Sequence, residues 1–170
     1  FKQLGLPTAA LTANFPCMQK LCRGGYDGRG VKKLLSAKEV LPGESLFEEV
    51  VAIHQEIAVQ IARDCHGNIK LYPIVEMVFD PHRNQLEYLI APAELTHVQI
   101  CQAETMATKL AAKLDLVGIL AVEMFVDRDG KILINELAPR LHNSGHHTLE
   151  ANTTSQFEQH LRAVTGLPLG

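Results

Sequence analysis

Two glutamates placed to bind a cation are the strongest chemical signal in this sequence. Glu123 and Glu136 lie in two apolar runs, 121–126 and 131–136, separated by the turn-forming sequence DRDG at 127–130. Apolar runs on both sides of such a turn predict a β-hairpin, in which side chains alternate between two faces. The register of the hairpin therefore decides whether the two carboxylates meet.

One register follows from supposing that the turn closes between Val126 and Lys131. Pairing of Val126 with Lys131 would place Glu123 opposite Ile134 and make Glu136 a diagonal neighbour on the same face, roughly 7–8 Å away. Two carboxylates at that separation on an apolar ribbon repel each other and need a cation or a shared proton between them. Hard oxygen ligands suit Mg²⁺. The alternative is an ordinary solvated or salt-bridged pair, and a one-residue bulge would put the two acids on opposite faces.

A polar segment follows the hairpin directly. Within 138–147, hydrogen-bonding side chains are more frequent than a connecting loop needs, and they are Arg140, His142, Asn143, Ser144 and His146. We expect this segment to contact a polar ligand. His142 and His146 also have a spacing found in zinc sites, but the segment has no helical pattern and Gly145 favours a loop.

A second candidate for ligand contact is rich in glycine. The sequence RGGYDGRG at 23–30 has four glycines in eight residues, so its backbone N–H groups could approach an anion closely. It matches neither the phosphate-binding loop of nucleotide hydrolases nor the dinucleotide-binding fingerprint. A mobile hairpin turn explains the same composition equally well.

Composition sets broad limits on function. The chain has 170 residues, 46% hydrophobic and 21% charged, with a net charge of −3, which is ordinary for one globular domain or most of one. The absence of a basic block argues against nucleic acid as a partner, and no apolar run approaches the length of a membrane span. Four cysteines without a paired spacing predict free thiols in the cytoplasm. The first residue is Phe1, so we expect the chain to begin inside a longer gene product.

The order of predicted elements is that of an α+β protein with a mostly antiparallel sheet. We expect strands at 15–21, 46–51, 56–63, 69–79 and 86–90, then a helix over 94–116, the acidic hairpin, the polar segment and a helix over 156–164. Apolar periodicity assigns a buried stripe to each helix. The expected buried residues are Met106, Leu110 and Leu114 in the first helix, and Phe157, Leu161 and Val164 in the second.

Several motifs together resemble one enzyme family. They are INELAPRLHNSGHHTLEA at 134–151, TSQFEQHLRAVTGLPLG at 154–170, GGYDGRG at 24–30 after a strand ending in Lys20, and Glu48 followed eight residues later by Glu56. These residues are similar to 5-(carboxyamino)imidazole ribonucleotide synthetase, the ATP-grasp enzyme of bacterial purine biosynthesis. The likeness runs essentially from end to end, and the HNSGH segment distinguishes this family from other ATP-grasp enzymes.

The resemblance implies an ATP-grasp fold, in which two α+β subdomains close on ATP. Residues 1–170 would form one ATP-grasp domain, with an ATP subdomain and linker at 1–52 and a second subdomain at 53–170. The family's N-terminal nucleotide-fold domain and most of its C-terminal domain are absent from this chain. Passages near 8–16 and 40–45 are shorter than in the family, so we expect residues to be missing there.

The resemblance also implies roles for individual residues. Lys20 would contact the ATP phosphates, and the glycine loop would close over them with Gly25, Tyr26, Asp27, Gly28, Arg29, Gly30 and Val31. The linker residues Glu48, Glu49, Val50 and Val51 would bind adenine, and Glu56 would bind the ribose. Glu123 and Glu136 would hold Mg²⁺ or Mn²⁺, beside Asn135. The residues facing aminoimidazole ribonucleotide and bicarbonate would be Tyr26, Asp27, Arg29, Arg140, His142, Asn143 and Ser144, the last four being catalytic.

The implied reaction is an ATP-dependent carboxylation of aminoimidazole ribonucleotide by bicarbonate through carboxyphosphate, in a cytoplasmic homodimer. Phe79 departs from the family, because some members carry a histidine there. Three alternatives remain. One is another ATP-grasp ligase of the formate-dependent glycinamide ribonucleotide transformylase type, which the HNSGH segment disfavours. The others are a zinc protein and an inactive ATP-binding module, and retention of Lys20, Glu123 and Glu136 counts against the latter.

Overall fold

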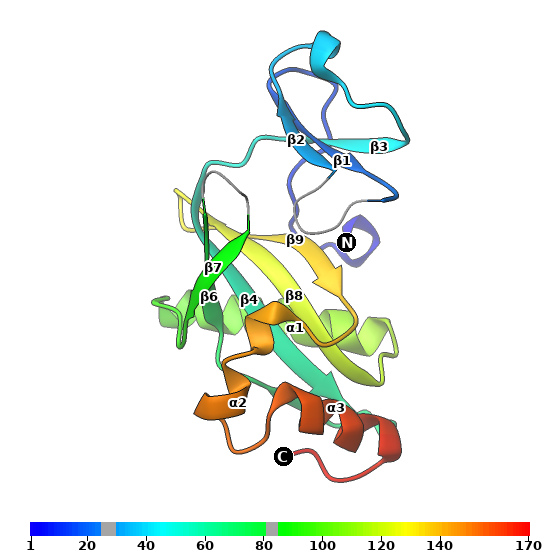
Figure 1. Ribbon diagram of the computed structural model, residues 1–170, viewed down its shortest axis with the longest axis vertical. Coiled ribbons are helices and arrows are strands. Elements are labelled where there is room, and N and C mark those ends of the chain that lie inside the picture. Colours follow the sequence, from blue (N-terminus) through cyan, green and yellow to red (C-terminus); the bar gives the residue numbers. More distant parts are fainter. Residues whose placement is uncertain (25–29, 81–84) are drawn as a thin grey trace.

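The protein consists of two antiparallel sheets arranged along its long axis (Figure 1). The computed structural model describes residues 1–24, 30–80 and 85–170. The smaller sheet, of order β2-β1-β3, contains β1 (Cys17–Leu21), β2 (Val31–Leu34) and β3 (Ser45–Glu49). The α+β class with antiparallel sheets is therefore confirmed.

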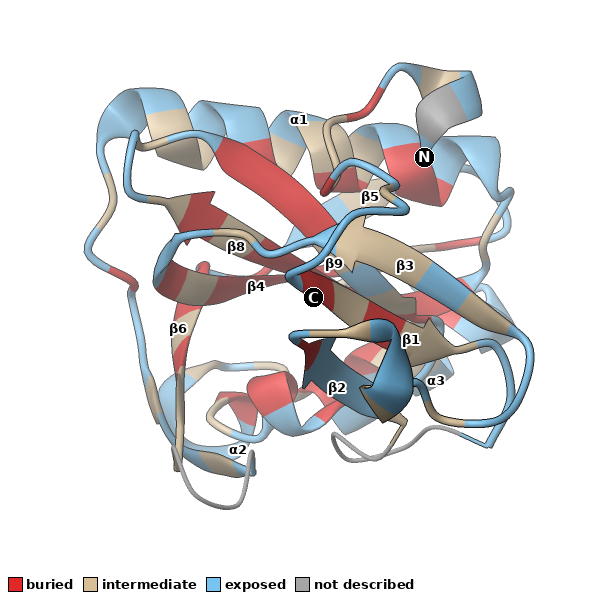
Figure 2. Cartoon of the chain, turned by 90° about the horizontal axis from the view of Figure 1, so that it is seen from above, coloured by how far each residue is buried: buried red, intermediate tan, exposed pale blue. Residues whose placement is uncertain are grey.

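The larger sheet has the order β7-β6-β4-β8-β9, and a short strand pairs with β4 beside this path. Its strands are β4 (Ile53–Arg63), β5 (Ile69–Leu71), β6 (Val75–Phe79), β7 (Leu86–Ile90), β8 (Gly118–Asp127) and β9 (Ile132–Ala138). The long β4–β8 pair forms its centre, and its side chains are the most deeply buried (Figure 2). The main apolar core lies on one face of this pair, and the other face carries Glu123 and Gln60 beside two smaller apolar clusters.

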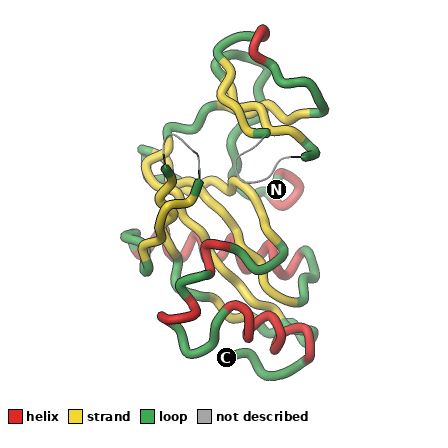
Figure 3. The backbone as a smooth tube through the Cα atoms, viewed as in Figure 1, coloured by secondary structure: helices red, strands yellow, loops and turns green. Residues whose placement is uncertain are grey.

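Helices cover both faces of the larger sheet (Figure 3). On one face, α1 (His97–Lys113) packs against the branched side chains of β4 and β8, such as Ile57, Ile61 and Val122. The other face meets α3 (Gln156–Thr165), preceded by the short α2 (Thr148–Ala151). The 3-10 turns are η1 (Lys2–Leu4), η2 (Ala37–Glu39) and η3 (Asn143–Gly145). None of the helices in the described ranges has both the length and the apolar character to cross a membrane.

The first helix is shorter than predicted, and its buried face follows the adjoining stripe of alanines that the sequence pattern also contains. Thr96 caps it through a reciprocal pair of hydrogen bonds with Gln99, which fixes its start at His97. Three alanines face the sheet beside Leu110, and their small side chains allow the helix to pack closely on the strands. They are Ala103, Ala107 and Ala111. Leu114 is 53% exposed, so its assignment to the core was wrong.

The last helix buries the face opposite to the predicted one. Phe157, Leu161 and Val164 are exposed, whereas two glutamines and Ala163 are buried. Apolar periodicity failed here because buried amides are tolerated when both of their polar atoms are hydrogen-bonded. Gln156 and Gln159 meet that condition, as described below.

An N-terminal segment holds the two sheets together. Ile134 of β9 donates its N–H to the Pro7 carbonyl, and Thr8 forms a parallel bridge with the same residue. A few residues later, Glu49 of β3 donates its N–H to the Ala10 carbonyl. Residues 7–12 therefore fix the small sheet relative to the strand that carries Glu136.

The burial pattern predicts how strongly single leucines contribute to stability. Leu120 of β8 is fully buried in the main apolar core, whereas Leu161 is 60% exposed on α3. Leu120→Ala should lower the free energy of unfolding by about 2–5 kcal/mol, because it leaves a cavity. Leu161→Ala should change it by less than about 0.5 kcal/mol. Urea unfolding of the two variants tests this, and equal losses would contradict the packing described.

Candidate active site

The structure places Glu123 of β8 and Glu136 of β9 directly opposite each other. The predicted register, with Glu123 opposite Ile134, was wrong because Ile134 pairs with Met124. Directly opposed residues share a face and lie closer than diagonal ones, with Cβ atoms roughly 4.5–5.5 Å apart. The two glutamates are therefore direct cross-strand partners and not the diagonal neighbours that the sequence predicted.

Two features of the backbone produce this register. Asp127 donates its N–H to the Lys131 carbonyl at 2.9 Å and so closes the turn, in which Gly130 has a φ of 79°. This three-residue loop shifts the pairing by one residue. An irregularity between Glu123 and Met124 then leaves Asn135 as an extra residue on β9 and shifts the pairing again. A bulge alone would have separated the acids, whereas the two shifts together bring them face to face.

The two carboxyl groups differ in their surroundings. Glu123 is buried, and its Oε1 lies 3.0 Å from His142 Nε2. Glu136 reaches solvent, yet its pKa is raised, first by partial desolvation and then by the charge of Glu123. The positive charges of Lys20 and Arg140 act in the opposite direction. Charge repulsion at this position favours a bound cation.

A third carboxyl group belongs to the same face. Glu56 lies on β4 in register with Phe125, two residues from Glu123 along β8. Burial, and then the charge of Glu123, raise the pKa of Glu56 to about 7. The sheet therefore carries three carboxyl groups on this face, and burial of Glu56 favours its protonated form.

Lys20 connects the small sheet to this acidic face. Its Nζ lies 2.8 Å from Asn135 Oδ1 on β9 and 2.8 Å from Glu48 Oε2 on β3. Asn135, the extra residue of the bulge, is thus the residue that accepts a hydrogen bond from Lys20. The side chain of Glu48 is engaged by Lys20, so Glu48 could contribute its backbone to a ligand without moving its carboxylate.

The polar segment brings His142 to the acidic pair. His142 Nδ1 lies 2.9 Å from Ser144 Oγ and accepts the Ser144 N–H at 3.3 Å, so its Nε2–H is directed at Glu123. Gln60 of β4 donates from Nε2 to Ser144 Oγ at 3.3 Å. A side chain at Gly145 would collide with Gln60 and Gln156, so the segment can pack this closely only with glycine there.

The remaining predicted residues fall into three groups. Arg140 and Asn143 are exposed beside His142, and Arg140 donates to the Leu141 carbonyl at 2.9 Å. The linker residues Glu49, Val50 and Val51 line a cavity of about 270 Å³ shared with the hairpin tip at 127–129. Gly30 directly precedes β2, and Val31 is the first residue of that strand. The rest of the glycine loop lies outside the described residues, namely Gly25, Tyr26, Asp27, Gly28 and Arg29.

Three residues that support the site were not predicted from the sequence. Gln60, Thr148 and Gln156 are buried and hydrogen-bonded to the segment 142–145. A polar residue at a position that faces the protein interior is the sequence feature that could have indicated these residues. Sequence periodicity alone did not reveal it, because the predicted inward face of the last helix was the opposite one.

The donor set fits Mg²⁺ as part of a larger complex. Among the residues that the structure describes, no group of three or more His, Cys, Asp or Glu side chains is placed to hold a metal ion. Mg²⁺ is commonly held by one or two carboxylates, with substrate phosphates and water completing the coordination. The facing carboxylates of Glu123 and Glu136 match that description. Zinc has less support, because His146 is exposed and both ring nitrogens of His142 have partners.

Comparison with known proteins identifies the class. A family model described as the ATP-grasp domain matches residues 2–157, so this chain belongs to the ATP-grasp family. N5-carboxyaminoimidazole ribonucleotide synthase of Bacillus subtilis is 44% identical over 172 residues, which cover 97% of this chain and 45% of that protein. The corresponding protein of Mycobacterium leprae is 44% identical over 91% of this chain and 37% of its own length.

Solved structures agree in fold. The N5-carboxyaminoimidazole ribonucleotide synthetase of Thermotoga maritima has a TM-score of 0.85 and 40% identity, covering 99% of this chain and 47% of that one. The chain therefore spans about half the length of the proteins it matches. An Aspergillus clavatus synthase in complex with ADP and 5-aminoimidazole ribonucleotide has a TM-score of 0.85 and 27% identity, covering 99% and 50%.

The raised pKa of Glu56 predicts a pH dependence of stability. Its folded pKa of about 7 exceeds the ordinary value of 4.5, so the folded state binds the proton more tightly. The contribution to stability is complete below pH 4.5 and is lost as pH rises through 7. Glu56→Gln should therefore gain roughly 1–3 kcal/mol relative to the unmodified protein between pH 5 and pH 8.

Urea unfolding in EDTA at both pH values measures this difference. Glu94→Gln, a change at an exposed glutamate, is the control and should leave the slope of stability against pH unaltered. An identical slope in Glu56→Gln and the unmodified protein would show that the carboxyl group is not destabilised by its burial.

Proposed function

We propose that this chain is the ATP-grasp core of an enzyme that carboxylates 5-aminoimidazole ribonucleotide with bicarbonate and ATP. The observation that carries the proposal is the convergence of Lys20, the Glu123–Glu136 pair and His142 on one face of the larger sheet. The names of the relatives, and the ADP and ribonucleotide bound in the Aspergillus clavatus structure, support the choice of substrates.

The phosphate end of the site would lie between the two sheets. Lys20 would contact the ATP phosphates from the small sheet, after exchanging its bond to Asn135 or Glu48 for a phosphate oxygen. Glu123 and Glu136 would hold Mg²⁺ or Mn²⁺, which when bound would neutralise charge on the phosphates. Phosphoryl transfer needs positioning and charge neutralisation more than covalent assistance.

The nucleoside end would follow the linker. Glu48, Glu49, Val50 and Val51 would bind adenine through their backbone, and Glu56 would bind the ribose hydroxyls. A carboxyl group with a pKa of about 7 can donate or accept a hydrogen bond near neutral pH. The glycine loop, Gly25 to Val31, would cover the phosphates and exclude water from a readily hydrolysed intermediate.

The acceptor end would be formed by the polar segment. Bicarbonate and the ribonucleotide are both anionic, and the exposed guanidinium of Arg140 can bind an anion with two parallel hydrogen bonds. His142, Asn143 and Ser144 would complete this surface, together with Tyr26, Asp27 and Arg29. His142 would act from its buried position beside Glu123.

The proposed reaction has two bond exchanges. An oxygen of bicarbonate attacks the γ-phosphorus of ATP, the bond from that phosphorus to the β,γ-bridging oxygen breaks, and ADP leaves. The exocyclic amine of the ribonucleotide then forms a bond to the carboxyl carbon of carboxyphosphate, while phosphate departs with the electron pair of its C–O bond. The nitrogen loses one proton to give the carboxyamino product. A homodimer and a cytoplasmic location remain predictions.

The full-length protein provides the test. ADP release from Mg²⁺-ATP should require both bicarbonate and 5-aminoimidazole ribonucleotide. Glu136→Gln should lower kcat by roughly 100-fold or more, because charge neutralisation at the phosphates is lost. Glu94→Gln is the matched control and should retain activity.

Two outcomes would contradict the proposal. Turnover with formate in place of bicarbonate would indicate the transformylase reaction. Turnover with an unrelated amine or carboxylate would preserve the ATP site but remove the roles assigned to Arg140, His142, Asn143 and Ser144.

A further inference from the structure

One buried glutamine holds the backbone of the active-site segment. Gln156, in the first turn of α3, is fully buried. Its Nε2 donates to the His142 carbonyl at 2.9 Å, and its Oε1 accepts the His142 N–H at 3.0 Å. A single side chain therefore satisfies both backbone polar groups of His142, as a neighbouring strand would.

The glutamine is itself fixed by a second contact to the same segment. Gln156 donates its backbone N–H to Thr148 Oγ1 at 2.8 Å, and that hydroxyl donates to the Gly145 carbonyl at 2.6 Å. Thr148 is fully buried as well. The segment 142–145 is thus held at its first and last residues by groups that do not face the site.

Fixing the backbone of His142 also restricts the orientation of its ring. With its N–H and carbonyl both bonded, the backbone of His142 has little freedom, and its ring is directed between Ser144 and Glu123. Catalytic groups must be held close to the productive geometry by supporting hydrogen bonds, and a displacement of about 1 Å can cost about 100-fold in rate.

We propose that Gln156 is a positioning residue that sets the His142 ring against Glu123, with Thr148 as its support. The kinetic consequence rests on the proposed function, because it assumes that His142 acts in the carboxylation. The structural consequence, a single orientation and tautomer of His142, does not depend on the reaction.

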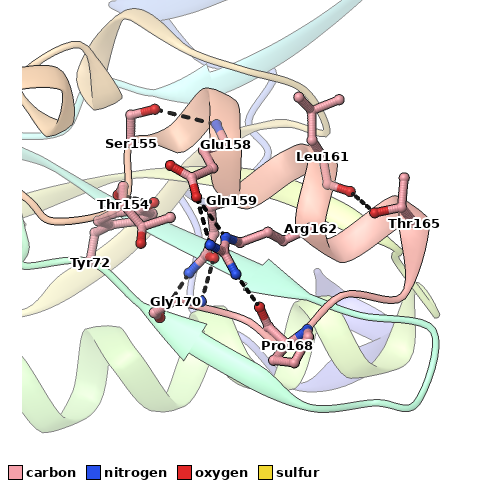
Figure 4. Close-up of polar contacts among 10 residues, drawn as sticks. All are labelled: Tyr72, Thr154, Ser155, Glu158, Gln159, Leu161, Arg162, Thr165, Pro168 and Gly170. Carbon is pink, nitrogen blue, oxygen red and sulfur yellow. Dashed lines mark hydrogen bonds and ion pairs between the residues drawn. The ribbon is translucent and has the colours of Figure 1, made fainter.

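The chain contains a matched control for this role. Gln159, one turn further along α3, is 3% exposed and makes the same pair of bonds to a different backbone. Its Nε2 donates to the Gly170 carbonyl at 3.2 Å, and its Oε1 accepts the Gly170 N–H at 2.8 Å (Figure 4). Gln156→Met removes two buried side-chain hydrogen bonds and Gln159→Met removes two part-buried ones, and only Gln156 contacts the active-site segment.

Steady-state kinetics of the full-length enzyme give the first readout. Gln156→Met should lower kcat about 10- to 100-fold while KM for ATP stays within about twofold. Gln159→Met should also lose thermal stability, through its two bonds to Gly170, and keep all kinetic constants within about twofold. Thr148→Ser should retain activity and Thr148→Val should lose part of it, which keeps the test open if Gln156→Met does not fold.

Histidine-selective ¹⁵N NMR gives a second readout that needs no turnover. The His142 signals are identified by their absence in His142→Gln, and the unmodified protein should show the Nε2–H tautomer. Gln156→Met should change or mix the tautomers, whereas Gln159→Met should not.

The two readouts separate failure of the proposed function from failure of this inference. If the unmodified enzyme shows no ribonucleotide-dependent ADP release but Gln156→Met alone alters the His142 signals, the function fails and the positioning role stands. If the enzyme turns over as proposed and the two methionine variants behave alike in both readouts, Gln156 has only a structural role and the inference is overturned.

Discussion

Repulsion between two facing carboxylates is the constraint on which this site depends. Glu123 and Glu136 are brought opposite each other by the closure of the hairpin turn and by the extra residue at Asn135. The protein offsets part of that repulsion with His142 beside Glu123 and with Lys20 bonded to Asn135. Burial first, and then the charge of Glu123, raise the pKa of Glu136, while Lys20, His142 and Arg140 lower it. A cation bound at the two carboxylates would relieve their mutual repulsion.

The rest of the fold keeps these charges in place. Lys20 belongs to the small sheet, and the segment 7–12 and the linker 50–52 are the backbone connections that hold that sheet over β9. His142 belongs to an irregular segment, which is fixed by buried amide and hydroxyl groups from β4, α2 and α3. Lys20 therefore approaches the site from the small sheet, whereas the acidic pair and His142 are both held on the larger one.

Residue types and periodicity predicted most of the longer elements and the identity of the acids, because apolar runs, turn residues and a hairpin leave a local pattern. The strand β2 was not predicted, and the strand expected at 69–79 is divided into β5 and β6. The register was not predictable, since a three-residue turn and a bulge each change it by one residue and neither has an unambiguous sequence signal. The buried face of α3 was assigned incorrectly for a related reason. Gln156 and Gln159 are buried only because distant backbone groups bond to them, and a local pattern contains no information about those partners.

A double-mutant cycle on Glu123→Gln and Glu136→Gln tests the central claim most directly. The free energy of unfolding of the four proteins would be measured in urea at pH 8 with EDTA. Loss of the His142 contact is common to both Glu123→Gln proteins and cancels in the cycle. The account predicts a repulsive coupling on the order of 1 kcal/mol that diminishes when Mg²⁺ and ADP are added. A coupling of zero, or an attractive one, in the absence of metal would contradict it.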